Sequence, residues 1–325
     1  MKKPVMPSGQ PLTIAPPPDL PVVVATMYRF VPLDDCATLK ETLTEIFQTH
    51  QLKGTILLAT EGLNGTVAGT ALGIAALFAF LHQDDRFADL RPKLSYVAEP
   101  PFKRMKVKVK REIVSMGVEG IEPAQQTGTH VEPEEWNQLL QDPEVLVIDT
   151  RNQYEYEVGT FEGAISPNTK HFREFPKFID ENLDPEQHPK VAMFCTGGIR
   201  CEKASAYLLK QGFEEVYQLE GGILNYLNTQ APDQSLWDGE CFVFDERVAV
   251  DEALQTGSYV MCFGCRSPLS KEDCQSDQYE SGISCPHCFA TLTEQQRSRF
   301  AERRLQIKLA TQKNRDHIGA VMPSQ

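Results

Sequence analysis

The chain has 325 residues, of which 41% are hydrophobic and 24% charged, and this excludes both a disordered chain and a disulfide-stapled miniature protein. The length instead fits two or three domains. The longest apolar run, at residues 71–81, is too short to cross a bilayer, and prolines stand where the apolar core of a secretion signal would be. We therefore expect a cytoplasmic protein that does not contact a membrane.

The acidic residues are unevenly distributed along the chain. The formal net charge of −13 argues against general nucleic-acid binding. However, residues 127–230 hold 18 acidic and 8 basic side chains, whereas residues 20–115 hold 10 acidic and 12 basic ones. The first part of the chain therefore stays open to an anionic partner.

After a mobile, proline-rich leader at residues 1–19, the pattern predicts an α+β domain. Apolar periodicity, helix caps and turn residues give the order strand, helix, strand, strand, helix, strand. The predicted elements are a strand at 22–31, a helix after Asp34 or Asp35, a strand at 54–60, a turn at 61–65, a short strand at 66–68, a helix at 70–81 and one or two strands between 93 and 110. This order is that of a ferredoxin-like domain, which we place at residues 20–116.

Beyond a linker at 117–128, strands alternate with helices, which is typical of an α/β domain with a central parallel sheet. The expected strands are 145–149 and 191–195, and the expected helices are 133–140, 171–182 and 201–211. We place this domain at 127–230. A third segment, 232–325, holds paired cysteines and a charged, basic helical tail from about 293 to 313.

The sharpest feature of the sequence is a cysteine loop between the strand at 191–195 and the helix that follows. Cys195 is followed by Gly197 and Gly198, and the helix begins near Arg200. Backbone N–H groups and the positive end of a helix lower the pKa of a thiol, glycines allow the N–H groups to turn inward, and an arginine adds positive charge. The pattern favours a nucleophilic Cys195, and the alternative is a buried core cysteine.

The loop consists of Cys195, Thr196, Gly197, Gly198, Ile199 and Arg200, and it resembles the Cys-x-x-Gly-x-Arg loop of rhodaneses. Asp149 and Arg151 match the rhodanese Asp-x-Arg signature, whereas Thr160 replaces the usual histidine. The resemblance implies a rhodanese domain in which Asp149 and Arg151 brace the loop. Its six-residue length disfavours the related cysteine phosphatases, which place their arginine where this chain has Cys201. Cys201 either resolves an oxidised Cys195 or is a small side chain packed on the helix.

The whole chain resembles the rhodanese-containing tRNA uridine hydroxylases over about residues 20–290. The likeness is carried by segments 54–65, 93–95, 102–108, 172–176, 195–203 and 241–247 and by the paired cysteines. The family implies oxygen-dependent conversion of the wobble uridine, position 34 in the tRNA anticodon loop, to 5-hydroxyuridine, with O2 as co-substrate and Cys195 as the essential thiol. The sequence carries neither a glycine fingerprint for flavin or NAD nor a motif that identifies the electron donor.

Two other functions fit the same residues. A rhodanese-type sulfurtransferase would carry a persulfide on Cys195 to an acceptor, using the same loop to deliver a different atom. A non-catalytic RNA-binding adaptor would use the rhodanese domain only as a scaffold.

A row of basic residues, Arg104, Lys106, Lys108 and Lys110, alternates with apolar residues near the end of the first domain. On a strand this alternation puts the four cations on one face, which suits RNA phosphates. The alternative is an edge strand kept soluble by its lysines. The charged tail, which includes Arg315, is either a further RNA-binding element or a solvated helix.

Two CxxC pairs separated by 19 residues predict a tetrahedral zinc site made of Cys262, Cys265, Cys285 and Cys288. Four thiolates leave no open coordination position, so the zinc is expected to be structural. His287 is a less favoured ligand, and Cys274 has no partner at this spacing. The alternative is a set of reduced cysteines without metal.

Overall fold

A computed structural model describes residues 12 and 14–313 of the protein. The chain forms two compact units. The first reaches to Cys241 and includes Glu252–Leu254, and the second comprises Phe242–Asp251 and the chain from Gln255 onward. Residues 1–11 and 13 of the predicted leader, and Arg315 of the predicted tail, lie outside the described residues.

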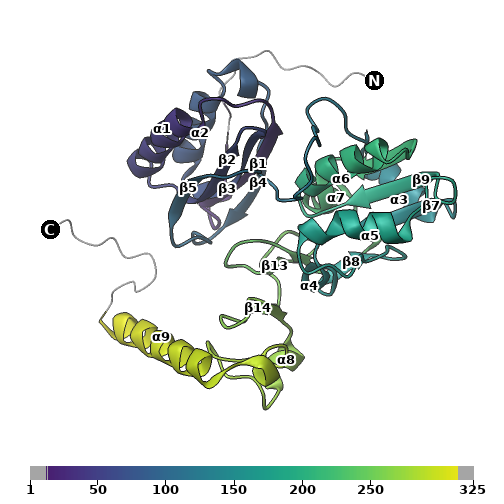
Figure 1. Cartoon of the computed structure of the whole chain (residues 1–325). Coiled ribbons are helices and arrows are strands. Elements are labelled where there is room, and N and C mark those ends of the chain that lie inside the picture. Colours follow the sequence, from purple (N-terminus) through teal and green to yellow (C-terminus); the bar gives the residue numbers. More distant parts are fainter. Residues whose placement is uncertain (1–11, 13, 314–325) are drawn as a thin grey trace. The chain divides into compact units, whose positions relative to one another are not determined.

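The first unit begins with a five-stranded sheet that carries two helices on one face (Figure 1). Its elements are β1 (Val22–Phe30), α1 (Cys36–Thr49), β2 (Lys53–Ala59), β3 (Gly62–Gly69), α2 (Ala71–Leu81), η1 (Asp85–Phe87), β4 (Lys93–Val97) and β5 (Met105–Val109). The strand order is β4-β1-β3-β2-β5, and only β5, at the edge beside β2, pairs in parallel. The element order is the predicted ferredoxin-like one, with β5 as a fifth strand.

The two faces of this sheet differ in character. Val23, Ala25 and Met27 of β1 pack against the helices, together with Leu43 of α1 and Leu77 of α2, and all five are buried. Because successive side chains of a strand point to opposite faces, the other face carries the alternate residues of β1. These residues are Val22, Val24, Thr26, Tyr28 and Phe30. We call this side of the sheet the open face.

The structure corrects the predicted turn at 61–65 and the short strand at 66–68, because β3 already begins at Gly62. Gly62 has a φ of +143°, and a Cβ atom there would lie 1.9 Å from the carbonyl oxygen of Arg29 in β1. A glycine is required for this close approach of two strands rather than for a turn. The chain reverses instead at Thr60 and Glu61.

The first unit continues with a four-stranded parallel sheet in the order β6-β10-β9-β7, which confirms the predicted α/β domain. The elements of this domain are β6 (Thr129–Val131), α3 (Pro133–Gln141), β7 (Val145–Asp149), α4 (Gln153–Tyr156), β8 (Gly159–Phe161), η2 (Phe172–Glu174), α5 (Phe175–Asn182), β9 (Lys190–Phe194), α6 (Ile199–Lys210), β10 (Glu215–Leu219), α7 (Gly222–Thr229), η3 (Pro232–Gln234) and β11 (Trp237–Gly239). Strands β8 and β11 form a small antiparallel pair of their own. Helix α5 packs beside α6, and α3 packs beside α7.

Segments without regular structure also contribute to the two cores. Met116 and Ile121, in the connection between the sheets, are buried in the core of the parallel sheet. In the described part of the leader, Leu12 and Ile14 pack against the core of the first sheet. The connection between the two sheets is therefore packed against the parallel-sheet domain and is not a free linker.

The second unit holds the paired cysteines and the charged helix. From the boundary between the units onward, the elements are β12 (Cys241–Phe242), β13 (Ala249–Val250), β14 (Val260–Met261), β15 (Pro268–Leu269), α8 (Lys271–Gln275), η4 (Phe289–Thr291) and α9 (Glu294–Gln312). Helix α9 is the predicted tail. Its Arg303 donates a 2.8 Å hydrogen bond to the carbonyl of Phe263, and its Arg304 pairs with Glu280 at 2.9 Å, so α9 packs on the cysteine-bearing loops.

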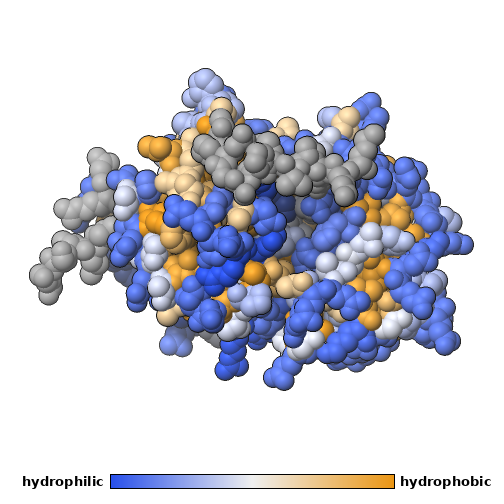
Figure 2. All heavy atoms as spheres, turned by 90° about the horizontal axis from the view of Figure 1, so that it is seen from above, coloured by the Kyte–Doolittle hydropathy of each residue, from blue (hydrophilic) through white to orange (hydrophobic). Residues whose placement is uncertain are grey.

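The surface seen in Figure 2 is mainly hydrophilic, and its hydrophobic residues gather in separate patches. Among residues 12 and 14–313, no helix combines the length and the apolar character that a membrane crossing requires.

Candidate active site

The cysteine loop joins the end of β9 to the start of α6. Gly198, directly before α6, has a φ of +98°, in the left-handed region that favours glycine. Gly222 at the start of α7 has a φ of +68°, and a Cβ atom there would lie 2.4 Å from the carbonyl oxygen of Cys195 and 2.7 Å from the amide nitrogen of Gly198. The N–H of Ile223 donates to the same carbonyl at 3.0 Å. The two glycine-bearing segments therefore hold each other in place.

The thiol of Cys195 is fully buried under the first turn of α6. The N–H of Gly198 donates to its Sγ atom at 3.1 Å. Burial alone raises the pKa of Cys195, but this is outweighed by a hydrogen bond from the Cys201 thiol, by the charge of Arg200 and by backbone N–H groups of Arg200 and Cys201. The pKa of Cys195 is thereby lowered from 9.0 to about 5. The shift favours the thiolate form of Cys195 at neutral pH.

Cys201 is the partner that keeps its proton. Its side chain is fully buried and its Sγ lies 3.7 Å from the hydroxyl oxygen of Thr150. Burial, followed by the hydrogen bond to Cys195 and the negative charge on that residue, raises the pKa of Cys201 well above its usual value. Cys201 therefore donates a hydrogen bond to Cys195. It is both a side chain packed in the core and a thiol beside the reactive one.

The Arg200 guanidinium is held by a carboxylate that the sequence analysis missed. Both oxygens of Glu155 in α4 accept hydrogen bonds from Arg200, at 2.8 and 2.7 Å, and both side chains are buried. The pairing fixes the arginine beside the loop, where its charge lowers the pKa of Cys195. Nothing in the local sequence marks Glu155, since it lies 45 residues before Arg200.

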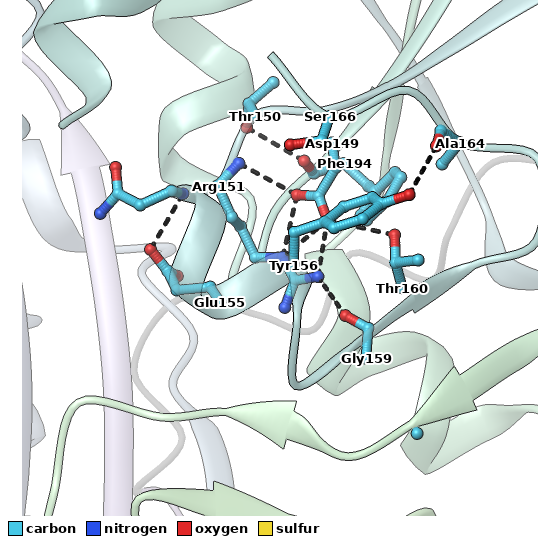
Figure 3. Close-up of polar contacts among 12 residues, drawn as sticks. Asp149, Thr150, Arg151, Glu155, Tyr156, Gly159, Thr160, Ala164, Ser166 and Phe194 are labelled. Atoms are coloured by element: carbon cyan, nitrogen blue, oxygen red, sulfur yellow. Dashed lines mark hydrogen bonds and ion pairs between the residues drawn. The ribbon is translucent and has the colours of Figure 1, made fainter. Parts of the chain in front are cut away.

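Asp149 and Arg151 form a fully buried ion pair at the end of β7 (Figure 3). The two charged groups are 2.6 Å apart, and Arg151 also donates to the carbonyl of Gly159 at 2.5 Å. Thr160, which replaces the rhodanese histidine, donates to Asp149 at 3.3 Å. The N–H and hydroxyl of Thr150 both donate to the carbonyl of Phe194, each at 3.0 Å. This last contact connects the end of β7 to the residue before Cys195.

The first sheet also reaches the cysteine loop, which the sequence analysis did not predict. Lys93 of β4 donates a short hydrogen bond to the carbonyl of Gly197, and its ammonium group lies 5.2 Å from the centre of the Tyr28 ring. Tyr28 of β1 donates to Glu202 of α6 at 3.0 Å. Burial lowers the pKa of Lys93. Lys93 belongs to a segment that carries the family resemblance, but the sequence does not indicate its partner.

A buried lysine of α6 also joins this helix to the first sheet domain. Lys203 is 2% exposed, and its ammonium lies 2.8 Å from Glu61 and 2.7 Å from Glu112. Glu202 and Lys203 therefore both bind residues of the first sheet domain. The helix that begins at the cysteine loop is in direct polar contact with that domain.

The four basic residues of the first domain lie on the edge strand β5 or next to it, and all are exposed. Met105 and Val107 between them pack toward the helices, so Lys106 and Lys108 lie on the open face. The structure does not bring this row into contact with the cysteine loop.

The paired cysteines of the second unit form one cluster. The Sγ atoms of Cys262, Cys265, Cys285 and Cys288 all lie within 4.8 Å of one another, and three of their separations are 3.7, 3.7 and 4.0 Å. Metal–sulfur bonds of about 2.3 Å in a tetrahedron separate the sulfurs by about 3.8 Å, so the cluster fits a tetrahedral metal ion. His287 instead pairs with Asp273 at 3.1 Å.

Comparison with known families matches two parts of the chain. Residues 22–113 match the family described as "UPF0176 acylphosphatase like domain", and residues 132–229 match the rhodanese-like domain. A solution NMR structure of a rhodanese-like domain from Anabaena is 18% identical, with a TM-score of 0.28, over 35% of this chain and 80% of that chain.

Two curated proteins are similar over almost the whole length. A protein of Teredinibacter turnerae named tRNA uridine(34) hydroxylase is 54% identical over 91% of this chain and 92% of its own length. A protein of Acaryochloris marina with the same name is 55% identical over 92% of this chain and 96% of its own length.

The lowered pKa of Cys195 predicts a specific titration. The thiolate absorbance of the wild type minus that of Cys195→Ser should persist at neutral pH and disappear as the pH falls through about 5, because protonation removes the thiolate. Cys201→Ala removes the thiol hydrogen bond and should move the midpoint upward by about one pH unit or more. Cys36→Ala, in the core of the first sheet, is the matched control and should leave the midpoint unchanged. A wild-type midpoint near 9 would contradict the assignment.

Proposed function

We propose that this chain, which belongs to the tRNA uridine(34) hydroxylase family, converts the wobble uridine of the tRNA anticodon loop to 5-hydroxyuridine in the cytoplasm. The observation that carries the proposal is a buried cysteine whose Sγ accepts an N–H hydrogen bond at the start of α6 and whose pKa is lowered there, in a chain more than half identical to two proteins with that name. The thiolate supplies a nucleophile where the family resemblance places the essential residue.

The proposed roles follow from the contacts of each residue. Cys195 is the reacting thiolate, and the N–H groups of its loop, from Thr196 to Arg200, stabilise negative charge on it. Arg200, held by Glu155, adds positive charge without needing to move. Asp149 and Arg151 keep the neighbouring strand end in place, as the buried ion pair between them supports.

Hydroxylation replaces the hydrogen on C5 of the uracil by a hydroxyl group. If that oxygen comes from O2, a pair of electrons and protons must reduce the second oxygen atom to water. We therefore propose O2 as co-substrate and an electron donor as a further partner. The sequence carries no glycine fingerprint for flavin or NAD and no motif that identifies the donor.

A second candidate function is sulfur transfer, favoured by one observation. The loop from Cys195 to Arg200 has the six-residue length of rhodaneses, and its N–H groups would stabilise a persulfide as they stabilise a thiolate. In that case the same cysteine would deliver sulfur rather than assist the delivery of oxygen.

We also propose that Arg104, Lys106, Lys108 and Lys110 bind the tRNA backbone. Their support is the exposure of all four side chains, which lie on or next to an edge strand whose Met105 and Val107 pack toward the helices. The chain's acidic residues are concentrated elsewhere, so this row keeps its positive potential.

The metal that we propose for the four-cysteine cluster is structural zinc. Four thiol groups at tetrahedral spacing suit Zn2+, and few large apolar side chains are available to stabilise so small a module. Bound zinc would cross-link the two CxxC loops and so contribute to the folding of the second unit.

The proposed activity predicts the nucleosides of cellular tRNA. In a strain that lacks this protein and any second pathway, 5-hydroxyuridine and its derivatives should disappear from wobble positions. Wild-type protein should restore them, whereas Cys195→Ser should not. The measurement is mass spectrometry of digested tRNA. Full restoration by Cys195→Ser would contradict the enzymatic role of the thiol and favour a non-catalytic RNA-binding adaptor.

The basic row predicts a change in salt dependence. Lys106→Ala combined with Lys108→Ala should weaken tRNA binding and flatten the log–log salt slope by about 0.7–0.9 for each phosphate that the protein no longer neutralises. Lys40→Ala, an exposed lysine of α1, serves as the control and should leave affinity and slope unchanged. If the double variant behaves like that control, β5 is only a soluble edge strand.

The zinc proposal predicts about one zinc per chain in the purified protein. Cys285→Ser should lose the metal and make the second unit sensitive to protease, because three thiolates no longer enclose the ion. The matched variant Cys274→Ser changes a cysteine outside the cluster and should retain both metal and resistance. Metal-free wild-type protein with a protease-resistant second unit would rule the site out.

A further inference from the structure

A cavity of about 690 Å³ lies within the first unit, between the first sheet domain and the parallel-sheet domain. Its lining includes Tyr28, Phe30, Lys93, His130, Glu220 and Gly221. We call it the seam cavity. Its volume is within the usual range for sites that enclose a small ligand. The roles proposed for the cysteine loop, the basic row and the four-cysteine cluster do not involve this cavity.

The seam cavity adjoins the cysteine loop. Lys93, which lines the cavity, donates to the carbonyl of Gly197 in that loop. Gly221, which also lines it, directly precedes the glycine that packs on the carbonyl of Cys195. A Cβ atom on Gly198 would lie 2.8 Å from the Tyr28 hydroxyl, so the aromatic wall and the loop are in close contact. A ligand in the cavity is therefore next to the segment that carries the thiolate.

The walls of the cavity suit a flat ring. Tyr28 and Phe30 extend from the open face of β1, half-buried, with their ring centres 6.3 Å apart and their planes inclined by 67°. Because the Lys93 ammonium lies over the Tyr28 ring, Phe30 is the ring on which a base would stack, with Tyr28 at its edge. Aromatic rings on the exposed face of a β-sheet are a common means of stacking single-stranded RNA bases.

The polar groups of the cavity suit the edge of uracil in particular. Uracil presents two carbonyl oxygens and one N–H between them. The Lys93 ammonium has three donors, of which the Gly197 carbonyl uses one. Glu220, whose carboxylate lies 3.9 Å from the His130 ring nitrogen, supplies an acceptor in the same cavity. A cytosine would instead place an acceptor nitrogen against the carboxylate and an amino group against the ammonium.

The rim of the cavity is basic. Arg29 pairs with Asp89 at 2.9 Å, and Arg91 is exposed, with no side-chain hydrogen bond or ion pair found for it among the described residues. Both arginines line the cavity, together with Asp89 and with polar groups of the parallel-sheet domain. Phosphates flanking a base in the cavity would meet positive charge at this rim.

The register of the first sheet connects this rim to the basic row on β5. Lys93 of β4 is paired with Thr26 of β1, and Thr26 with Thr66 of β3. Thr66 is paired with Thr55 of β2, and Thr55 with Lys106 of β5. Directly paired residues of neighbouring strands point to the same face. A polar ladder with a lysine at each end therefore crosses the open face, from the basic row to the seam cavity.

From these observations we infer that the seam cavity binds one uridine nucleotide of a single-stranded RNA loop, turned out of its stack, with the flanking phosphates on the polar ladder and rim. The inference rests on the proposed function for the identity of the RNA. Turning the base outward is what an enzyme needs in order to reach a ring atom of a stacked nucleotide.

The test uses the full-length protein and a short anticodon stem–loop RNA with 5-iodouridine at the wobble position. Ultraviolet cross-linking followed by peptide mass spectrometry should place the wobble base on Tyr28 or Phe30. A cross-link to β5 or to the second unit instead would overturn the inference. So would equal affinity for an otherwise identical RNA that carries cytidine at the wobble position, where the polar edge predicts weaker binding.

Two variants add a measurement of affinity. Phe30→Ala removes a stacking ring and should weaken RNA binding about ten-fold or more. Arg91→Ala, which changes an exposed side chain and so tests the rim without risk to the core, should weaken binding several-fold and reduce the salt slope. Leu72→Ala, 76% exposed on α2, is the control and should bind normally. Normal binding by both cavity variants would overturn the inference.

These outcomes separate the cavity from the chemistry. A wobble cross-link in the cavity, together with unchanged 5-hydroxyuridine in a deletion strain, would retain the binding site and reject the hydroxylase. Thiol-dependent hydroxylation with a cross-link elsewhere would retain the hydroxylase and reject the cavity.

Discussion

The first two turns of α6 are the part of the molecule on which the rest of the site depends. Their N-terminal N–H groups hold the Cys195 thiolate, and their side chains reach in two directions. Arg200 binds Glu155 within the parallel-sheet domain, whereas Glu202 and Lys203 bind residues of the first sheet domain. One short helical segment therefore sets the charge on the thiol and connects it to the domain that carries the basic row.

Such a segment is stable only because each buried charge has a partner. Arg200, Glu202 and Lys203 are all less than 9% exposed, and removing one partner of a buried pair costs about 3–5 kcal/mol. For Lys203, whose partners Glu61 and Glu112 lie in the first sheet domain, this cost opposes separation of the two sheet domains near the loop. It also keeps Lys93 on the carbonyl of Gly197, which holds the first sheet domain against the cysteine loop. Under the proposed function, an RNA bound to that domain would meet the loop in a fixed orientation.

The sequence predicted the parts of the site that are local in the chain. The cysteine loop and the two CxxC pairs are recognisable because their chemistry requires a short fixed spacing, and the basic row follows from the alternation of a strand. The Glu155 and Lys93 contacts join residues 45 and 104 positions apart, and no periodicity records such pairings. Gly62 misled the prediction for a different reason, since glycine serves close strand approach as well as turns.

The central claim is that the Cys195 thiolate serves the transfer of oxygen, and not of sulfur, to a uridine held by the first sheet domain. The most direct measurement supplies purified protein and undermodified tRNA to an extract of the deletion strain under 18O2, with 34S-labelled thiosulfate present. Mass spectrometry of the wobble nucleoside should find one 18O atom with wild-type protein and none with Cys195→Ser. Incorporation of 34S, or of oxygen from water, would contradict the account.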